Sequence, residues 1–165
     1  MTMTLFQNLL ADAFFSAIAA TGFAVISNPP KKAVAIAAML SAIGHSFRYY
    51  LLHAQGLDLA TSTFFAAFLI GLLSFAFGKL IRCPSEVFTF PSLLPMIPGM
   101  YAYNMFLSLT KFIRSDSDFH PQLIEDIFKN GLTAVFVMLA LVVGVSIPML
   151  FFHEQSYQLS RPKRH

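Results

Sequence analysis

The sequence predicts an all-α fold: a polytopic helical membrane protein with about five transmembrane helices, one of them broken by prolines. Of its 165 residues, 56% are hydrophobic and only 12% are charged, and the mean hydropathy of +0.66 lies outside the range of soluble proteins. Apolar stretches of about 20 residues recur along the chain, the length that crosses a bilayer core. Basic residues lie at the ends of these stretches and do not form a patch. We therefore expect the net charge of +3 to set the orientation of the chain in the membrane, and we expect no nucleic-acid partner.

The first three spans are predicted from apolar runs that end at turn residues and basic residues. The first covers about 5–27 and is closed by two prolines and two lysines. The second covers about 33–54 and is less hydrophobic, because it contains a histidine and an arginine. The third covers about 59–81 and is strongly apolar. Because the second span is weaker, a four-span arrangement remains an alternative.

The fourth predicted span, about 87–113, carries Pro91, Pro95 and Pro98 in its first half. Proline removes an amide donor and clashes with the preceding helical turn, so this half is expected to be kinked or unwound. Regular helix is expected to resume near Met100.

A charged loop over 114–126 separates the fourth span from the fifth, which is predicted over about 127–152. Residues 1–153 are therefore expected to form a single transmembrane domain. Residues 154–165 form a basic tail that is expected in the cytoplasm.

Counting the basic residues of the connections predicts the orientation. Five crossings place seven of them on one side and three on the other, which favours an amino terminus in the periplasm and a carboxyl terminus in the cytoplasm. The seven are Lys31, Lys32, Lys79, Arg82, Arg161, Lys163 and Arg164, and the three are Lys111, Arg114 and Lys129.

Sequence motifs of the common enzyme classes are not found. The chain has no Walker loop, dinucleotide fingerprint, nucleophile elbow or zincin motif, and its single cysteine has no neighbouring histidine cluster. We therefore expect a protein that is not an enzyme, with no catalytic residue, cofactor or metal site.

Three segments of the chain carry a resemblance to a known family. They are GFAVISNPP (22–30), SAIGHSFRYYL (41–51) and VFTFPSLLPMIPGMYAY (87–103). In this order they resemble the threonine/serine exporter family, and specifically its smaller subunit. The most specific features are a Gly-His pair followed by Arg48 and a Pro-Met-x-Pro-Gly run before a tyrosine.

This resemblance implies a multi-pass protein of the bacterial inner membrane that exports small polar amino acids or, in some split systems, organic acids such as succinate. In fused members the similar region is the carboxyl-terminal half, and this chain lacks the longer half. The resemblance therefore implies a separately encoded larger membrane subunit as partner. Because alternating access usually needs two bundles or repeats, a homo-oligomer is the alternative source of the second bundle.

Three ionisable residues lie inside the predicted spans and away from their ends, where a charge is costly unless it faces protein or water. They are Asp12, His45 and Arg48. His45 and Arg48 are three residues apart and share one helix face with Ser41. At 1.5 Å per residue, Asp12 and Arg48 lie about 10 Å and about 9 Å below the outer ends of their spans, which predicts an ion pair between them. A substrate carboxylate competing for Arg48 would then couple binding to helix movement.

Each of these residues also has a simpler interpretation. Arg48 can snorkel to the outer headgroups while Asp12 occupies a water-filled niche. His45 can make a packing hydrogen bond instead of carrying a coupled proton. The sequence leaves both interpretations open.

The proline-rich segment is the strongest backbone signal, because carbonyl groups there lose their helical partners. In a membrane such backbone is tolerated where it lines a cavity or is buried in protein. We therefore expect Pro95, Pro98 and Gly99 to line the substrate pathway. Three residues that follow can donate hydrogen bonds to a polar substrate, namely Tyr101, Tyr103 and Asn104. A structural kink with an interfacial tyrosine is the alternative.

The sequence thus supports two classes of function. In the first, the chain is a transport subunit whose own residues contact a small polar metabolite. In the second, it is an assembly subunit that stabilises a partner transporter without touching substrate. A passive channel is a third interpretation.

Overall fold

The computed structural model describes the backbone of residues 5–114 and 121–158, and side chains up to Phe151. The described residues form helices joined by short turns. In chain order they are α1 (Leu5–Ile26), α2 (Lys31–His53), α3 (Leu59–Ile81), α4 (Glu86–Leu93), the 3-10 turn η1 (Leu94–Met96), α5 (Gly99–Arg114) and α6 (Pro121–Gln158). The predicted all-α class is confirmed.

Three of the helices are long and apolar enough to cross a membrane, namely α1, α3 and residues 121–151 of α6. The chain is therefore a polytopic helical membrane protein. Helix α2 has a similar length of 23 residues, but its two lysines, histidines and arginine make it less apolar. The five crossings predicted from the sequence thus remain a prediction for α2 and for the interrupted α4–η1–α5 segment.

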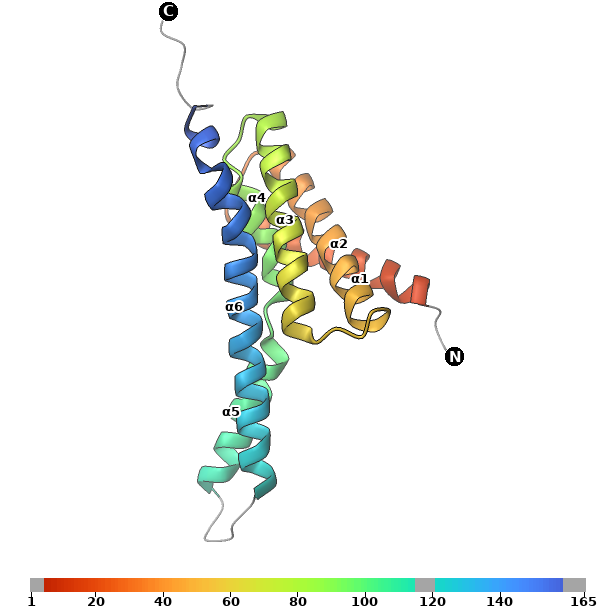
Figure 1. The fold of residues 1–165 in the computed structure, drawn as a ribbon, viewed down its shortest axis with the longest axis vertical. Coiled ribbons are helices and arrows are strands. Elements are labelled where there is room, and N and C mark those ends of the chain that lie inside the picture. Colours follow the sequence, from red (N-terminus) through yellow and green to blue (C-terminus); the bar gives the residue numbers. More distant parts are fainter. Residues whose placement is uncertain (1–4, 115–120, 159–165) are drawn as a thin grey trace, which may run out of the picture.

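The helices form a bundle with one long extension. Helices α1 to α4 gather with the carboxyl-terminal half of α6, while α5 and the amino-terminal half of α6 run away from them as a two-helix hairpin (Figure 1). Helix α6 has 38 residues, which corresponds to about 57 Å and exceeds the roughly 30 Å of a bilayer core.

The fifth predicted span begins earlier than the sequence indicated. Helix α6 starts at Pro121 and incorporates Glu125 and Asp126, which were expected in a loop over 114–126. Proline suits the first turn of a helix, because the amide it lacks has no helical partner there. The helix also continues to Gln158, into the predicted tail, of which 159–165 lie outside the described residues.

Small residues allow α3 and α6 to approach closely. A Cβ added to Gly144 would lie 2.6 Å from the carbonyl oxygen of Phe64 and 3.0 Å from Cβ of Ala67. On the facing side, a Cβ on Gly71 would lie 3.2 Å from the carbonyl oxygen of Val145. Glycine at helix contacts is typical of membrane bundles, where close backbone approach provides the packing energy.

The interruption predicted in the fourth span is confirmed, although the prolines act differently from one another. Pro91 lies inside α4 and Pro95 lies in η1. The chain leaves helical geometry at Ile97, whose ψ of 131° is the extended conformation that a following proline imposes. Pro98 therefore causes the break, and α5 begins directly after it at Gly99.

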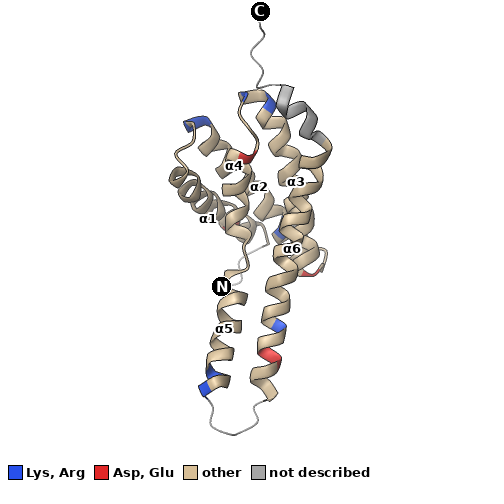
Figure 2. Cartoon of the chain, turned by 90° about the vertical axis from the view of Figure 1, so that its left-hand side faces the viewer, with Lys and Arg blue, Asp and Glu red and all other residues tan. Residues whose placement is uncertain are grey.

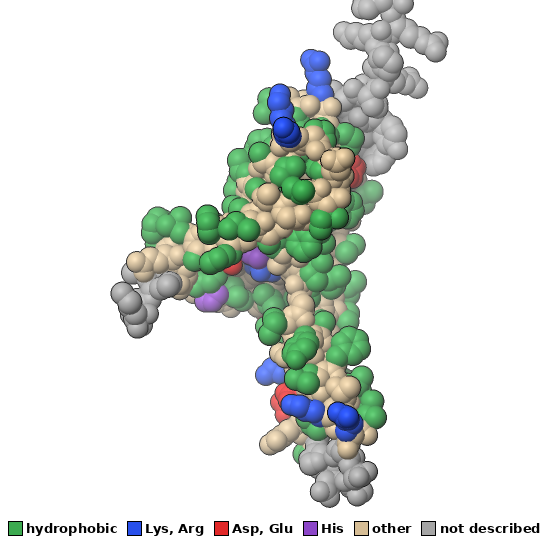
Figure 3. Space-filling view, turned by 180° about the vertical axis from the view of Figure 1, so that it is seen from behind, with side chains coloured by type: hydrophobic (Ala, Val, Ile, Leu, Met, Phe, Trp, Pro, Cys, Tyr) green, Lys and Arg blue, Asp and Glu red, His purple; other side chains and the backbone are tan. Residues whose placement is uncertain are grey.

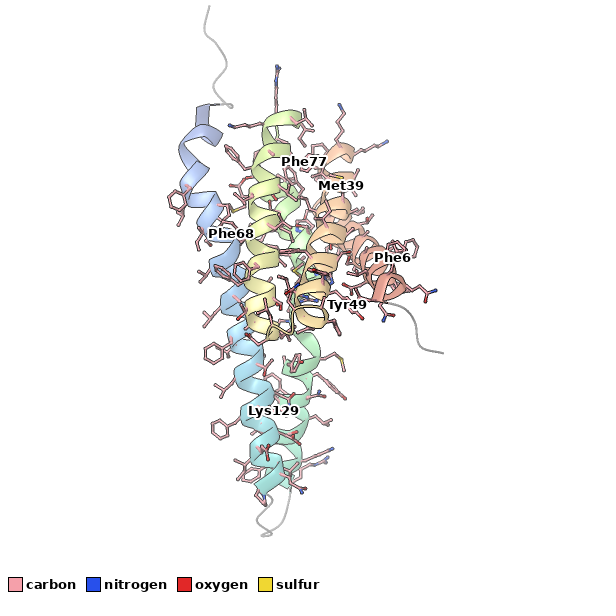
Figure 4. The ribbon with its side chains drawn as sticks, turned by 45° about the vertical axis from the view of Figure 1, so that its right-hand side comes forward. Phe6, Met39, Tyr49, Phe68, Phe77 and Lys129 are labelled. Carbon is pink, nitrogen blue, oxygen red and sulfur yellow. The ribbon has the colours of Figure 1, made fainter. Side chains whose placement is uncertain are left out.

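Charge and apolar surface are separated along the long axis. Lysines and arginines collect at the ends of α2 and α3 at one end of the molecule and at the tip of the α5–α6 hairpin at the other (Figure 2). Large apolar side chains stay exposed between them, including Phe14 of α1 at 62% and Phe136 of α6 at 57%. Figure 4 shows Phe6 and Met39 on this outer surface. Such a surface suits lipid or other membrane helices rather than water.

Candidate functional site around Arg48

The contact between α1 and α2 brings the first two ionisable residues together. Oδ2 of Asp12 lies 3.2 Å from Nδ1 of His45. The side chain of His45 is only 7% exposed and that of Asp12 is 34% exposed. Figure 3 shows acidic, basic and histidine side chains grouped in the otherwise hydrophobic middle of the molecule, beside α1.

Arg48 lies one helical turn further along α2 and joins this pair to the interrupted helix. Its Nη1 donates a hydrogen bond to the carbonyl oxygen of Met96 at 3.2 Å, and its Nη2 lies 3.5 Å from Nδ1 of His45. Met96 ends the 3-10 turn, where carbonyl groups lack helical partners. The guanidinium therefore stabilises backbone that the proline break leaves open.

The predicted ion pair between Asp12 and Arg48 is wrong in its detail. Asp12 pairs with His45, and Arg48 pairs with the Met96 carbonyl, so the histidine stands between the two charges. Asp12 and Arg48 remain within electrostatic range of each other. Equal depth in two helices did not specify which of the two ionisable side chains of α2 contacts Asp12, and His45, three residues before Arg48, is the one that does.

Ser41 supports the α1–α2 contact. It is fully buried, and its hydroxyl donates to the carbonyl oxygen of Ser16 on α1 at 3.1 Å. Because Ser41 lies one turn before His45, this bond fixes the two helices beside the Asp12–His45 pair. Its hydroxyl proton is directed at backbone and not at the ionisable cluster.

The remaining predicted site residues lie on either side of the break. Pro98 is buried, Pro95 is partly buried and Gly99 is exposed at the start of α5. Tyr103 is 59% exposed, and Asn104 is partly buried. Among the hydrogen bonds of the described residues, none joins Tyr103 or Asn104 to the cluster of Asp12, His45 and Arg48.

Two further groups lie beside Arg48, and only the first was missed by the sequence analysis. The first is the Met96 carbonyl, which accepts from its guanidinium. The second is Tyr101, whose phenol lies within electrostatic range of the guanidinium. The sequence signal for Met96 was its place between Pro95 and Pro98, where a freed carbonyl is expected.

The α1–α2 contact also forms a groove, and the described residues include no metal-binding group. A largely apolar groove of about 530 Å³ runs between α1 and α2, lined by residues next to Asp12 and His45 in the sequence, such as Ala13 and Ser46. Within the described residues, no group of three or more histidine, cysteine or acidic side chains is placed to hold a metal ion.

The fold and this cluster define a class. A multi-pass helical protein in which buried ionisable side chains meet an interrupted helix has the arrangement typical of membrane transporters.

Comparison with known proteins identifies the family. The family model described as threonine/serine exporter, ThrE, matches residues 12–151, and the chain belongs to this family. An uncharacterized protein of Haemophilus influenzae is 34% identical over 154 residues, which cover 93% of this chain and 51% of that protein. The chain therefore spans about half the length of this relative. No solved structure matches the chain.

Proposed function

We propose that this chain is a subunit of a bacterial inner-membrane exporter of small polar amino acids such as threonine and serine, or of small organic acids such as succinate. It acts with a larger membrane subunit, and its own residues contact the substrate. Five segments cross the membrane, with the amino terminus in the periplasm and the carboxyl terminus in the cytoplasm.

One observation carries the proposal: the Arg48 guanidinium is held between His45 and the Met96 carbonyl at the interrupted helix. All the substrates considered have a carboxylate, and a guanidinium is the side chain best suited to bind one with two hydrogen bonds. Arg48 donates to a neutral carbonyl acceptor, so a carboxylate that replaces this acceptor adds a pairing of opposite charges.

The larger subunit is supported by the exposed surface of the apolar spans. In an apolar 18-residue stretch of each of the three spans, only 17% to 33% of the residues are buried within this chain, so the other residues can contact lipid or partner helices.

Replacement of Arg48 tests the proposal. Arg48→Gln keeps a hydrogen-bond donor for Met96 but loses the charge, so export of labelled serine and succinate should fall by about 10-fold or more if the charge–carboxylate bond contributes roughly 1.5–3 kcal/mol. Membrane abundance should remain normal. Arg82→Gln, which removes an exposed arginine at the end of α3, is the matched control and should export normally.

The alternative is an assembly subunit that stabilises a partner transporter without touching substrate. In that case Arg48→Gln would change the abundance of the partner and not the rate of export per complex. Retained export at normal abundance would remove Arg48 from the site.

A further inference from the structure

Two buried serines of α3 have hydroxyl groups without a hydrogen-bond partner in the part of the chain that the structure describes. They are Ser62 and Ser74, and both are fully buried. A hydroxyl inside a helix can bond to its own backbone, as Thr63 does to the carbonyl oxygen of Leu59 at 2.6 Å. A buried hydroxyl without any partner lowers stability, so each of these two positions needs an explanation.

The contact between α3 and α4 has a defined register. Near the end of α3, a Cβ added to Gly78 would lie 3.6 Å from Cβ of Ser85, which directly precedes α4. Two turns earlier on α3, Ile70 belongs to the same buried cluster as Leu93, the last residue of α4. The two helices therefore run in opposite directions, and residues midway between these two contacts face each other.

The middle of this contact is polar. Ser74 lies midway on α3 and Thr89 lies midway on α4, and both are buried. The hydroxyl of Thr89 donates to the carbonyl oxygen of Ser85 at 2.7 Å, and the hydroxyl of Ser92 donates to the carbonyl oxygen of Thr89 at 2.6 Å. Thr89 and Ser92 are three residues apart and share one face of α4. Three hydroxyl side chains thus share this contact, and only that of Ser74 has no partner among the described residues.

The segment that carries two of these hydroxyls is bounded by two breaks in helical geometry. Before it, Arg82 ends α3 with a φ of 54°, in the left-handed region, and after it Ile97 is extended. Helices α1, α2 and α3 all contact α4, which lies among them (Figure 2). The hydrogen bond from Arg48 to the Met96 carbonyl ties the far end of the segment to α2. Breaks of this kind allow a short segment to move as a unit, and here the end near Arg82 is the one free to separate from α3.

We propose that Ser74, Thr89 and Ser92 line a second substrate-binding position, between Arg48 and the basic end of α2 and α3. This inference rests on the proposed function. Helix α4 closes the position in this structure and separates from α3 to admit the substrate. The ammonium and hydroxyl groups of a small polar amino acid then donate to the Ser74 oxygen, and its carboxylate accepts from the hydroxyls. The unpaired Ser74 hydroxyl is thus kept for a substrate that reaches it before it reaches Arg48.

Removal of the hydroxyl separates this role from a structural one. Ser74→Ala removes an unpaired buried polar group, so the unfolding temperature of the complex with the larger subunit should rise in detergent. Export of labelled serine by the same complex in cells should nevertheless fall by about 2- to 10-fold, the effect of losing one hydrogen bond. Export by Ser74→Ala at the wild-type rate would overturn the inference and leave the proposed function intact.

Ser62→Ala is the matched control. Ser62 is as buried as Ser74 and also lacks a partner among the described residues, but it lies about three turns away, near the start of α3 and far from α4. Its replacement should raise the unfolding temperature as well and should leave export unchanged. Absence of serine export by the wild-type complex would instead refute the proposed function.

A second measurement follows the opening of α4, with single cysteines in a Cys83→Ser background. Ser74→Cys should react with a charged, membrane-impermeant methanethiosulfonate added to everted vesicles that transport serine, whereas Ser62→Cys should not. Unlabelled serine at ten times its half-saturating concentration should slow the reaction about 10-fold, because it occupies the position. Ser74→Cys as unreactive as Ser62→Cys in vesicles that transport serine would overturn the inference.

Discussion

At the scale of single residues, the sequence predicted the members of the cluster but not the order in which they pair. Asp12, His45 and Arg48 were recognised because ionisable groups inside apolar helices are costly. Their connections depend on helix rotation and on side-chain direction, which residue spacing leaves undetermined. The Met96 carbonyl is a backbone group, so no side-chain pattern reveals it.

A residue-scale prediction concerns the start of α3. Asp58 is its N-cap: Oδ2 accepts from the amide of Thr61 at 2.9 Å, and Oδ1 accepts from the hydroxyl of Thr61 at 2.6 Å. Asp58→Ala should lower the free energy of unfolding by about 1 kcal/mol at pH 7. Thermal unfolding followed by circular dichroism in detergent measures this loss, and Asp58→Asn, which retains a capping oxygen, should lose much less.

The same cap has a defined pH dependence. Hydrogen bonds from the Thr61 side chain and backbone lower the pKa of Asp58, because they stabilise the charged form. A lowered folded-state pKa means that the stabilisation is present above the usual aspartate range and disappears as the pH falls through the folded-state value. The difference between wild type and Asp58→Ala should therefore shrink below about pH 4. A difference that is constant down to pH 2 would contradict this assignment.

At the scale of elements, the helix ends were predicted well where turn residues mark them. The turn after α1, the end of α3 and the restart at Gly99 each lie within two residues of the predicted position. The start of α6 was missed because the acidic residues before 127 suggested a loop. They lie instead on a helix that extends beyond the apolar stretch, and hydropathy locates the membrane part of a helix rather than its full length.

An element-scale prediction follows from the α3–α6 contact. Gly144→Ala would place a methyl group 2.6 Å from the Phe64 carbonyl, and backbone cannot yield as a flexible side chain does. Overpacking of this kind should cost about 1–3 kcal/mol and lower the unfolding temperature in detergent.

Gly22→Ala is the matched control within α1. A Cβ at Gly22 meets no atom within 4 Å, so the substitution should be neutral or should stabilise the helix by up to about 1 kcal/mol. Equal unfolding temperatures for Gly144→Ala and wild type would show that α3 and α6 do not approach as closely as described.

At the scale of the whole molecule, the sequence predicted an all-α membrane fold from composition and span length. It did not predict the α5–α6 hairpin that extends from the bundle (Figure 1). The hairpin follows from the 38-residue length of α6 and from the break at Pro98, which sends α5 along α6 and away from α4. Neither feature can be predicted by counting apolar spans, because both depend on how the helices pack.

A whole-molecule prediction concerns topology, with single cysteines introduced in a Cys83→Ser background. With five crossings, Gln55→Cys in the turn between α2 and α3 should react with a membrane-impermeant maleimide on intact spheroplasts. Lys32→Cys, at the start of α2, should react only in everted vesicles. Both positions are exposed in the structure. Labelling of the two from the same side would show that α2 does not cross and would support the four-span arrangement.

The most direct test of the account is efflux of labelled serine, threonine and succinate from cells that produce this chain alone, the larger subunit alone, or both together. Efflux is expected only when both are present at normal membrane abundance. Efflux with this chain alone would contradict it, because a self-sufficient homo-oligomer would then be the exporter.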